Sequence, residues 1–364
     1  MIEDKGIDCE WVSQQGVRGI YSTEKLAHAR KALEIMQSTA PDLAAYMRLV
    51  TDKSELAKYR LATADGAMVT SVAARMWPYK LVSKILECLL TSSDLTGTFN
   101  LQTLTPATSI TREQASGQWQ VSTSRGTIVT KAIALATNAY TSHLLPGWAD
   151  LIVPCRGQMS ALYPLPSLSG EHRLPTSYGF EGDGLDDYLI QRPNERGGHL
   201  MFGGGRTQNH SMGVTDDSVV DGATAAYLRR QLVDVFALPE GKEKEMVEMQ
   251  ASHQWTGIMG FSRDDLPWVG PVPEHQGVFL AAGFTGHGMP NTWHSGKAVA
   301  EMISRSLQGQ SSEEGVARAQ QVTGLPKAYQ VSLERIKKAM SIDDYEVREW
   351  EEMERTRRVQ HEAQ

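Results

Sequence analysis

Hydrophobic residues recur at helical spacing near the start of the chain. Leu26, Leu33 and Met36 fall on one face of a helix. Ser22 stands before them, and serine is a preferred N-cap because its hydroxyl accepts a hydrogen bond from a free backbone N–H. The pattern predicts helices within residues 22–60.

A change of composition and a second helical stripe follow. Residues 65–76 are rich in glycine, alanine, serine and threonine, as in a loop or a short strand. Pro78 then occupies a first-turn position of a helix. The apolar stripe of that helix comprises Leu81, Val82, Ile85, Leu86 and Leu89. We expect Trp77 and Tyr79, at its start, to be core residues.

The hydrophobic period then changes to two residues, which is typical of strands. Between 98 and 137 apolar residues alternate with threonine, glutamine and serine, and the stretch ends in the apolar run 132–135. Such a run suits a strand buried on both faces, as in a parallel sheet covered by helices. A second run, 278–282, leads into a glycine-rich turn at 283–289 and a helix over 291–307.

The pattern changes again over residues 151–262, which indicates a different layer of the fold. Apolar segments alternate there with turn residues, for example at 194–198, which predicts an antiparallel sheet. The chain is therefore expected to be α/β, or α+β overall, with the layers interleaved along the sequence.

Composition narrows the classes of function. The 364 residues include 36 Lys and Arg against 43 Asp and Glu, a net charge of −7, so we expect no nucleic-acid partner. No run of 18 apolar residues occurs, so no membrane partner is expected, and the start lacks an apolar secretory segment. Three widely spaced cysteines support neither a disulfide framework nor a metal site. The expected location is the cytoplasm.

The turn at 283–289 carries the most chemical information. Glycine has no Cβ, so a flat ligand can approach the backbone closely. The helix that follows directs free N–H groups and the positive end of its dipole to the same place, which stabilises negative charge on a bound group. The alternative interpretation is a tight strand-to-helix connection that needs glycine for packing alone.

A resemblance favours the ligand-binding interpretation. The strings Asp-x-x-Pro-x-x-Gly-Pro at 264–271, Ala-Ala-Gly-Phe-x-Gly-His-Gly at 281–288 and Gly-Lys-x-x-Ala-Glu at 296–301 closely resemble the C-terminal part of the FAD-dependent D-amino-acid oxidase superfamily. This superfamily includes glycine oxidase and sarcosine oxidase. The likeness covers residues 8–305, with further ordered matches at 77–81, 105–110, 136–140, 156–158, 188–190 and 202–205.

The resemblance implies a Rossmann-like FAD domain interleaved with an antiparallel substrate domain. The implied divisions are a helical part of the substrate domain at 1–60, FAD-domain parts at 61–150 and 263–310, an antiparallel substrate part at 151–262, and a charged helical tail at 311–364. The implied cofactor-binding residues are Ala107, Thr137, Asn138, Gly283, Phe284, Gly286, Gly288, Met289 and Pro290. No cysteine stands where relatives attach flavin covalently, so FAD is expected to be bound non-covalently.

The sequence also departs from the family pattern. The superfamily holds the FAD pyrophosphate with Gly-x-Gly-x-x-Gly between a strand and a helix, and the chain contains no such motif. We therefore expect the initial dinucleotide-binding unit to be missing and the FAD domain to be incomplete, in a truncated or a degenerate family member. Residues 257–260 lack the arginine that often binds a substrate carboxylate, and Pro290 replaces the lysine of sarcosine oxidases. Both losses favour a larger or less acidic amine.

The expected catalytic residues are His287, Tyr188 and Arg192. His287 follows the glycine turn, and alternation places Tyr188 and Arg192 on one strand face. The alternatives are a histidine bonded to its own loop and a surface tyrosine and arginine. Asp264 and Asp265 are expected to form a turn with Arg263, without a catalytic role.

The expected function is oxidation of a C–N bond in a small-molecule amine or amino-acid-like substrate. Hydride transfer to FAD would give an imine that water hydrolyses. One alternative is a non-catalytic protein that binds FAD weakly or not at all. Another is a flavin enzyme acting on C–O or C–C bonds. The acidic tail at 343–354 is expected to be a solvated helix face.

Overall fold

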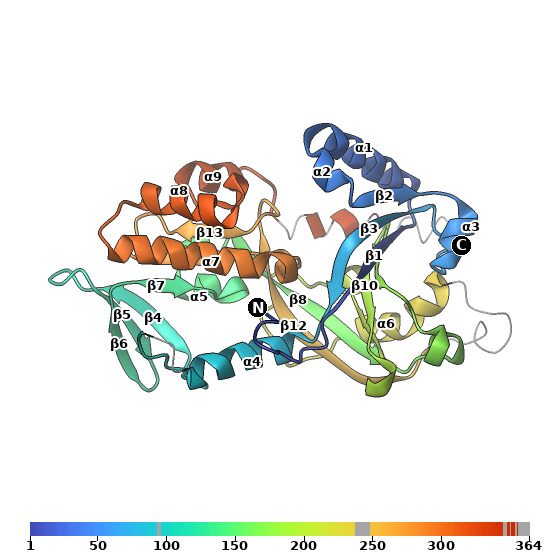
Figure 1. Ribbon diagram of the computed structural model, residues 1–364, viewed down its shortest axis with the longest axis horizontal. Helices are drawn as coiled ribbons and strands as arrows, with labels where there is room; N and C mark the ends of the chain where they lie inside the picture. Colours follow the sequence, from blue (N-terminus) through green and yellow to red (C-terminus); the bar gives the residue numbers. More distant parts are fainter. Residues whose placement is uncertain (93–95, 237–247, 345–347, 350, 354, 356–364) are drawn as a thin grey trace.

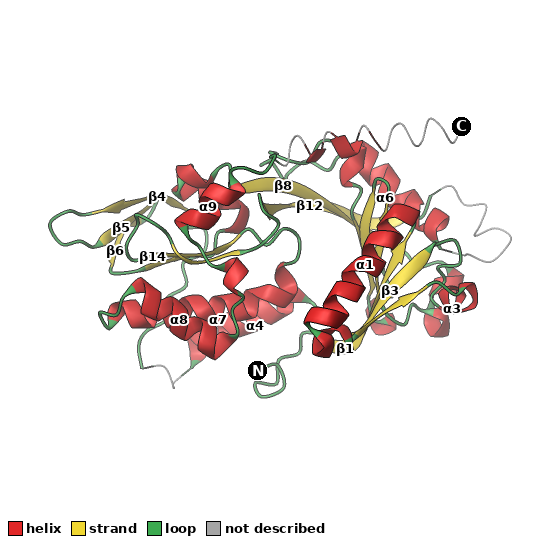
Figure 2. Ribbon diagram, turned by 90° about the horizontal axis from the view of Figure 1, so that it is seen from above, coloured by secondary structure: helices red, strands yellow, loops and turns green. Residues whose placement is uncertain are grey.

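The computed structural model describes residues 1–92, 96–236, 248–344, 348, 349, 351–353 and 355. Its elements form a large-sheet lobe and a small-sheet lobe, which lie side by side in Figure 1. Figure 2 shows the long strands β8 and β12 running from the first lobe toward the second. The mixed α/β organisation expected from the sequence is confirmed.

The large sheet is mostly antiparallel. Its spatial order is β12 (Ala251–Ser262), β8 (Ile152–Leu162), β11 (Leu200–Gly203), β10 (Leu185–Gln191), β9 (Ser177–Gly182), β1 (Val12–Ile20), β3 (Gly66–Arg75) and β2 (Met47–Val50). Strands β1 and β9 pair in parallel, whereas the neighbouring strands from β8 to β12 pair antiparallel, as expected. The segment expected to be a loop or a short strand is β3, which has ten residues.

Helix α6 (Gly222–Val235) covers one face of the large sheet. Leu228 and Leu232 of α6 pack against strand residues such as Phe180 and Phe202 in a fully buried cluster. The helices expected within 22–60 are α1 (Thr23–Thr39), α2 (Pro41–Ala44) and α3 (Lys53–Lys58). Because alternate residues of a strand point to opposite faces, the other face of the sheet presents a separate row of side chains.

The small-sheet lobe contains two three-stranded sheets within the described residues. One has the order β13 (Trp268–Pro271), β14 (Val278–Ala282), β7 (Ile133–Leu135), and the other β4 (Ala107–Arg112), β5 (Trp119–Thr123), β6 (Gly126–Thr130). The two apolar runs expected to be buried strands are β7 and β14, and they pair in parallel. Helix α7 (Gly288–Leu307) packs on this sheet through Ala298, Val299 and Met302, and α8 (Ser312–Thr323) packs beside it.

Helix α4 (Pro78–Thr91) differs from the expectation of core residues at its start. Trp77 is 37% exposed and Tyr79 is 76% exposed, so the interpretation of both as core residues was wrong. The amphipathic stripe of α4 carries no fully buried side chain. An apolar stripe establishes the helix, but the contacts it makes depend on the tertiary arrangement.

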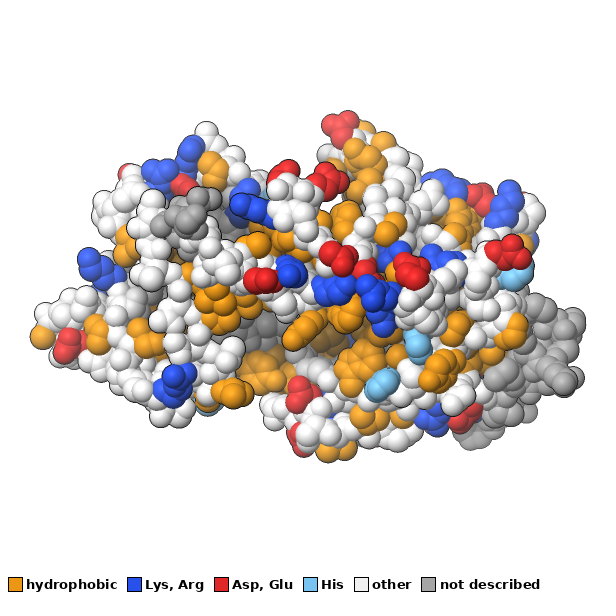
Figure 3. All heavy atoms as spheres, turned by 60° about the horizontal axis from the view of Figure 1, so that its bottom comes forward, with side chains coloured by type: hydrophobic (Ala, Val, Ile, Leu, Met, Phe, Trp, Pro, Cys, Tyr) orange, Lys and Arg blue, Asp and Glu red, His pale blue; other side chains and the backbone are white. Residues whose placement is uncertain are grey.

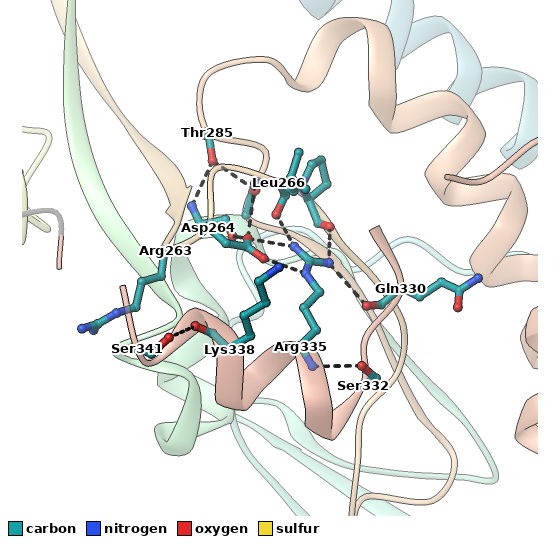
Figure 4. Close-up of polar contacts among 12 residues, drawn as sticks. Arg263, Asp264, Leu266, Thr285, Gln330, Ser332, Arg335, Lys338 and Ser341 are labelled. Carbon is teal, nitrogen blue, oxygen red and sulfur yellow. Dashed lines mark hydrogen bonds and ion pairs between the residues drawn. The ribbon is translucent and has the colours of Figure 1, made fainter. Parts of the chain in front are cut away.

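Helix α9 (Leu333–Ala339) anchors the later part of the chain through Arg335. Figure 4 shows the Arg335 guanidinium between the Asp264 carboxylate and backbone carbonyls. Its Nε and Nη2 atoms donate to Asp264 at 2.8 and 2.9 Å, and Nη1 and Nη2 donate to the carbonyls of Pro267 and Leu266. The guanidinium also lies 3.7 Å from the ring centroid of Trp268.

The expected turn of Arg263, Asp264 and Asp265 is confirmed: the Asp265 N–H donates to the Ser262 carbonyl at 2.9 Å, and the side chains of the turn bind partners elsewhere in the chain. Asp264 pairs with Arg335, Asp265 pairs with Arg348 at 3.3 Å, and Arg263 donates to the carbonyls of Ile342 and Asp150. A sequence shows that charged neighbours are adjacent, but a carboxylate pairs with the cation that tertiary packing brings to it.

The acidic tail, expected at 343–354 to be a solvated helix face, contains a buried carboxylate. Glu349 is buried at 8% exposure, and its carboxylate accepts hydrogen bonds from the Ser211 hydroxyl and from the N–H groups of Ser211 and Met212. His210 Nδ1 lies 3.0 Å from the same carboxylate. The expectation of a wholly solvated face at 343–354 was therefore wrong at this position. Among the described residues, no helix is both long and apolar enough to span a membrane.

Candidate functional site

The glycine turn connects β14 to α7 and has an unusual backbone. Gly283, Thr285 and Gly286 have φ values of 72°, 48° and 74°, in the left-handed region that side chains disfavour. Gly283 and Phe284 are buried beneath the turn, whereas residues 286, 287, 289 and 290 are exposed. The turn therefore has a buried base and an accessible rim.

Asn138 joins this turn to the end of the neighbouring strand. It follows β7 at a left-handed φ of 44°, which asparagine tolerates better than most residues. Its Oδ1 accepts the N–H groups of Gly283 at 2.9 Å and Phe284 at 3.4 Å. Thr137 lies beside it, with its hydroxyl 2.9 Å from that of Thr141. The structure thus brings together four residues expected near a cofactor, at the carboxyl ends of parallel strands, where ligands bind in open α/β sheets.

Strand β12 reaches the same corner from the large sheet. The carbonyl of Gly260 accepts the N–H of Thr285 at 2.9 Å. A Cβ on Gly260 would lie 2.7 Å from Asn138 Oδ1 and 2.8 Å from the N atom of Ala139, so only glycine fits there. Sequence analysis did not single out Gly260, although a glycine inside a strand is a recognised sign of close backbone approach.

The N-terminus of α7 opens at the exposed rim. His287 is the N-cap residue and makes no side-chain cap. Its Nδ1 lies 2.8 Å from the carbonyl of Thr285, which requires the proton on Nδ1 and leaves Nε2 as an acceptor. The first N–H groups of a helix have no partner within the helix. This edge therefore offers N–H donors and a positive dipole end to a bound group.

Ala107 lies in a neighbouring element. It begins β4, which contacts α5 (Thr141–Leu144), the short helix that follows Asn138. The elements that carry Ala107 and Asn138 are thus connected through α5.

A row of large side chains crosses the open face of the large sheet. Tyr188 of β10 stands opposite Gly203 of β11, which stands opposite Met159 of β8, and Met159 stands opposite Trp255 of β12. The Tyr188 hydroxyl donates to Met159 Sδ at 3.0 Å across Gly203. Tyr188 is 47% exposed and Trp255 is 39% exposed. We define Trp255, Met159 and Tyr188 as the sheet row.

Phe261 connects the sheet lobe to the glycine turn. Its Cζ lies 4.0 Å from the position that a Cβ on Gly286 would occupy. The Arg206 guanidinium lies 5.2 Å from the centroid of the same ring and pairs with the Asp186 carboxylate. No sequence pattern indicated Phe261, Arg206 or Asp186, because it is the tertiary structure that brings the loop after β11 over the end of β12.

Arg192 contacts a different neighbour from Tyr188. It lies one residue beyond β10, and its guanidinium stacks 4.9 Å from the centroid of Trp77, at the start of α4. In the described contacts Tyr188 bonds to Met159, and His287 bonds to its own turn. The expected catalytic residues therefore each contact a different neighbour and do not bond to one another in the described contacts.

The described part of the chain contains no cluster of three or more histidine, cysteine, aspartate or glutamate side chains suited to a metal ion. The parts of the site that could bind a cofactor or a substrate are instead the glycine turn at 283–289, the N-terminus of α7 and the sheet row.

Comparison with known families gives a match over most of the chain. Residues 1–302 match the profile of the family described as "FAD dependent oxidoreductase". The glycine oxidase of Pseudomonas aeruginosa is 31% identical over 186 residues, which are 50% of this chain and 44% of that protein. A probable oxidoreductase, OrdL, of Rhizobium meliloti is 26% identical over 196 residues, 52% of this chain and 40% of its own length. The matched regions span less than half of these relatives.

Solved structures show the same fold. Glycine oxidase from Geobacillus kaustophilus has a TM-score of 0.64 at 20% identity, with 84% of this chain and 74% of that chain covered. L-proline dehydrogenase from P. horikoshii has a TM-score of 0.61 at 17% identity, with coverages of 85% and 76%. Iminodiacetate oxidase from Chelativorans sp. BNC1 has a TM-score of 0.61 at 14% identity, with coverages of 86% and 78%.

Proposed function

The chain belongs to the family of FAD-dependent oxidoreductases, and we propose that it oxidises the C–N bond of an amine or amino-acid-like small molecule. One observation carries the proposal: the exposed rim of the glycine turn and the open α7 N-terminus lie beside Phe261, on the strand β12 that also carries Trp255 of the sheet row. The relatives named for glycine, L-proline and iminodiacetate support the class, because all three compounds contain C–N bonds.

The residues of the turn fit the flavin of FAD. Gly286 has open space where a side chain would stand, with Phe261 alone approaching to 4.0 Å. The N–H groups at the start of α7 would hold a polar edge of the flavin and stabilise negative charge on it. The loops after β7 and β14 would be held in position by the contacts of Thr137, Asn138, Gly283 and Phe284. When bound, FAD would supply the hydride acceptor.

The remaining site residues have roles consistent with their contacts. His287 Nδ1 lies against the Thr285 carbonyl, so the other ring nitrogen, Nε2, would be the atom available to the substrate. Tyr188 would form a wall of the substrate site with its ring and bond to Met159 with its hydroxyl. Arg192, stacked on Trp77, would border the outer end of that wall.

The alternative of a non-catalytic protein is favoured by one observation. The 364 residues contain no Gly-x-Gly-x-x-Gly motif, which in dinucleotide-binding domains places the pyrophosphate on a helix N-terminus. The absorbance spectrum of the purified protein with added FAD separates the proposals, because bound oxidised flavin absorbs at about 370 and 450 nm. A spectrum without these bands after removal of free FAD would support the non-catalytic alternative.

A matched pair of variants tests the site itself. Gly286→Ala places a Cβ on the exposed rim at a positive φ, and we expect it to weaken FAD binding at least tenfold. Gly324→Ala introduces the same backbone strain at the end of α8, where nothing lies within 4 Å, and should leave binding unchanged. Loss of the 450 nm band on anaerobic addition of amines supports C–N oxidation. Loss of the band with alcohols alone would contradict it.

A further inference from the structure

The open face of the large sheet carries the apolar sheet row, and two arginines beside this row, Arg206 and Arg18, are paired with carboxylates of the chain. The row itself is continuous because Gly203 lies within it: a Cβ there would be 2.1 Å from Met159 Sδ and 2.7 Å from the Tyr188 ring. Met259 extends the apolar surface toward Phe261 and lies over Gly157, where a Cβ would approach its Cε to 2.8 Å. Methionine and aromatic side chains form an adaptable apolar surface.

Arg206 is the cation at the glycine-turn end of this face. It stacks on Phe261 and forms an ion pair with Asp186, which shares a strand face with Tyr188. Burial alone would lower the pKa of Arg206, but nearby groups, the Asp186 carboxylate foremost, outweigh burial and raise it. Its charge is therefore balanced by the chain's own carboxylates.

Arg18 borders the same face and is also paired with a carboxylate. Arg18 lies over Gly179, which stands opposite Tyr188, and its guanidinium is 3.6 Å from the Glu181 carboxylate. Arg192 stacks on Trp77. On the face drawn in Figure 3, hydrophobic side chains gather around the hollowed middle of the molecule, and acidic and basic side chains lie beside one another near it.

A substrate carboxylate placed against this row would lose water, and the described cations beside the row, Arg206 and Arg18, already pair with Asp186 and Glu181. Removing an ion from water without a partner is unfavourable, whereas burying an apolar group is favourable in proportion to the area buried. We infer that the sheet row selects amines that carry an aromatic or other large apolar group and no free carboxylate, with Tyr188, Met159 and Trp255 as the residues that determine specificity. This inference rests on the proposed function and narrows its substrate class.

Two matched ligands test the inference: phenethylamine, and phenylalanine, which differs from it by one carboxylate. Binding to the FAD-supplied protein is measured by calorimetry and by tryptophan fluorescence, so the readout does not depend on turnover. We expect phenethylamine to bind at least tenfold more tightly than either enantiomer of phenylalanine. Trp255→Ala and Met159→Ala should each weaken phenethylamine binding about fivefold.

An Asp186 variant gives the sharper test. Asp186→Asn removes a carboxylate that balances Arg206, so phenylalanine binding should strengthen about tenfold while phenethylamine binding changes little. Asp234→Asn, an exposed position on α6 on the other side of the sheet, is the control and should change neither. Phenylalanine binding as tight as phenethylamine in the unaltered protein overturns the inference, as does binding of neither ligand.

The outcomes separate this inference from the proposed function. Tight phenethylamine binding without flavin reduction by any amine would retain the selectivity and reject the oxidation. Reduction by phenylalanine in preference to phenethylamine would retain the oxidation and reject the selectivity.

Discussion

The side-chain oxygen of Asn138 accepts the backbone N–H of Gly283 at 2.9 Å, across 145 positions of the sequence. This bond joins the turn after β7 to the turn after β14. The two strands pair in parallel, so their carboxyl ends lie together, and the asparagine fixes the distance between the loops that follow. The corner of the candidate cofactor site therefore depends on one side chain held at a positive φ.

Two substitutions of Asn138 should distinguish the contribution of its hydrogen bonds to stability from that of its backbone conformation. Asn138→Gly removes the acceptor but tolerates the positive φ, and we expect a loss of about 1 kcal/mol in the free energy of unfolding. Asn138→Ala removes the acceptor and adds strain at φ 44°, for a loss of about 2 kcal/mol. Urea denaturation measures both. Equal stability of the two variants would show that the conformation at residue 138 relaxes.

Arg335 should be among the most sensitive positions for stability. Arg335→Met leaves the Asp264 carboxylate and the carbonyls of Leu266 and Pro267 without their donor, and we expect a loss of about 3–5 kcal/mol. Arg335→Lys, which keeps the charge but not the two-pronged geometry, should fall between this variant and the unaltered protein. As a control, Arg318→Met removes an exposed pair at 3.8 Å and should cost less than about 1 kcal/mol. Similar losses at both arginines would contradict the ranking.

Asp187 should make stability depend on pH. Burial raises the pKa of Asp187 to about 7, against the lowering effect of hydrogen bonds from the Tyr227 hydroxyl at 2.6 Å and the Gly205 N–H at 2.7 Å. The folded protein holds this proton more tightly than the unfolded chain, so the stabilisation is full below about pH 4 and is lost as the pH rises to about 7. The loss is on the order of 4 kcal/mol at most.

Variants of Asp187 and Tyr227 test whether Asp187 causes this dependence of stability on pH. Asp187→Asn should remove this part of the pH dependence in urea denaturation series, whereas the exposed control Asp216→Asn should retain it. Tyr227→Phe removes a bond that lowers the pKa of Asp187, so the decline should extend above pH 7. An unchanged profile in Asp187→Asn would assign the dependence to another group.

Glu349 should hold the described part of the C-terminal segment on the large-sheet lobe. Glu349→Gln replaces an acceptor oxygen by an NH₂ group that cannot accept the N–H groups of Ser211 and Met212. We expect trypsin to cleave after Arg348 at least fivefold faster, because that residue's contacts with Asp265 and Arg263 depend on the docked segment. Glu351→Gln alters an exposed neighbour and should leave the rate unchanged. Equal rates in the two variants would contradict an anchoring role.

Short stretches of sequence were enough to predict the local elements around the glycine turn. Apolar runs indicated β7 and β14, helical periodicity indicated α1, and the glycines at 283–288 indicated a turn before a helix. The expected helix start at 291 was three residues late, since α7 begins at Gly288. These features depend on backbone conformation and on side chains within a few residues, so short stretches of sequence encode them.

The contacts between residues far apart in the sequence could not be predicted in this way. The pairs Asn138 with Gly283, Arg335 with Asp264, Asp187 with Tyr227 and Glu349 with Ser211 depend on which strand ends, loops and helix faces pack together. The exposure of Trp77 and the stacking of Arg206 on Phe261 have the same origin. Burial and charge pairing are properties of the packed chain: an apolar or charged side chain has no fixed partner until the lobes and their sheets bring one within contact.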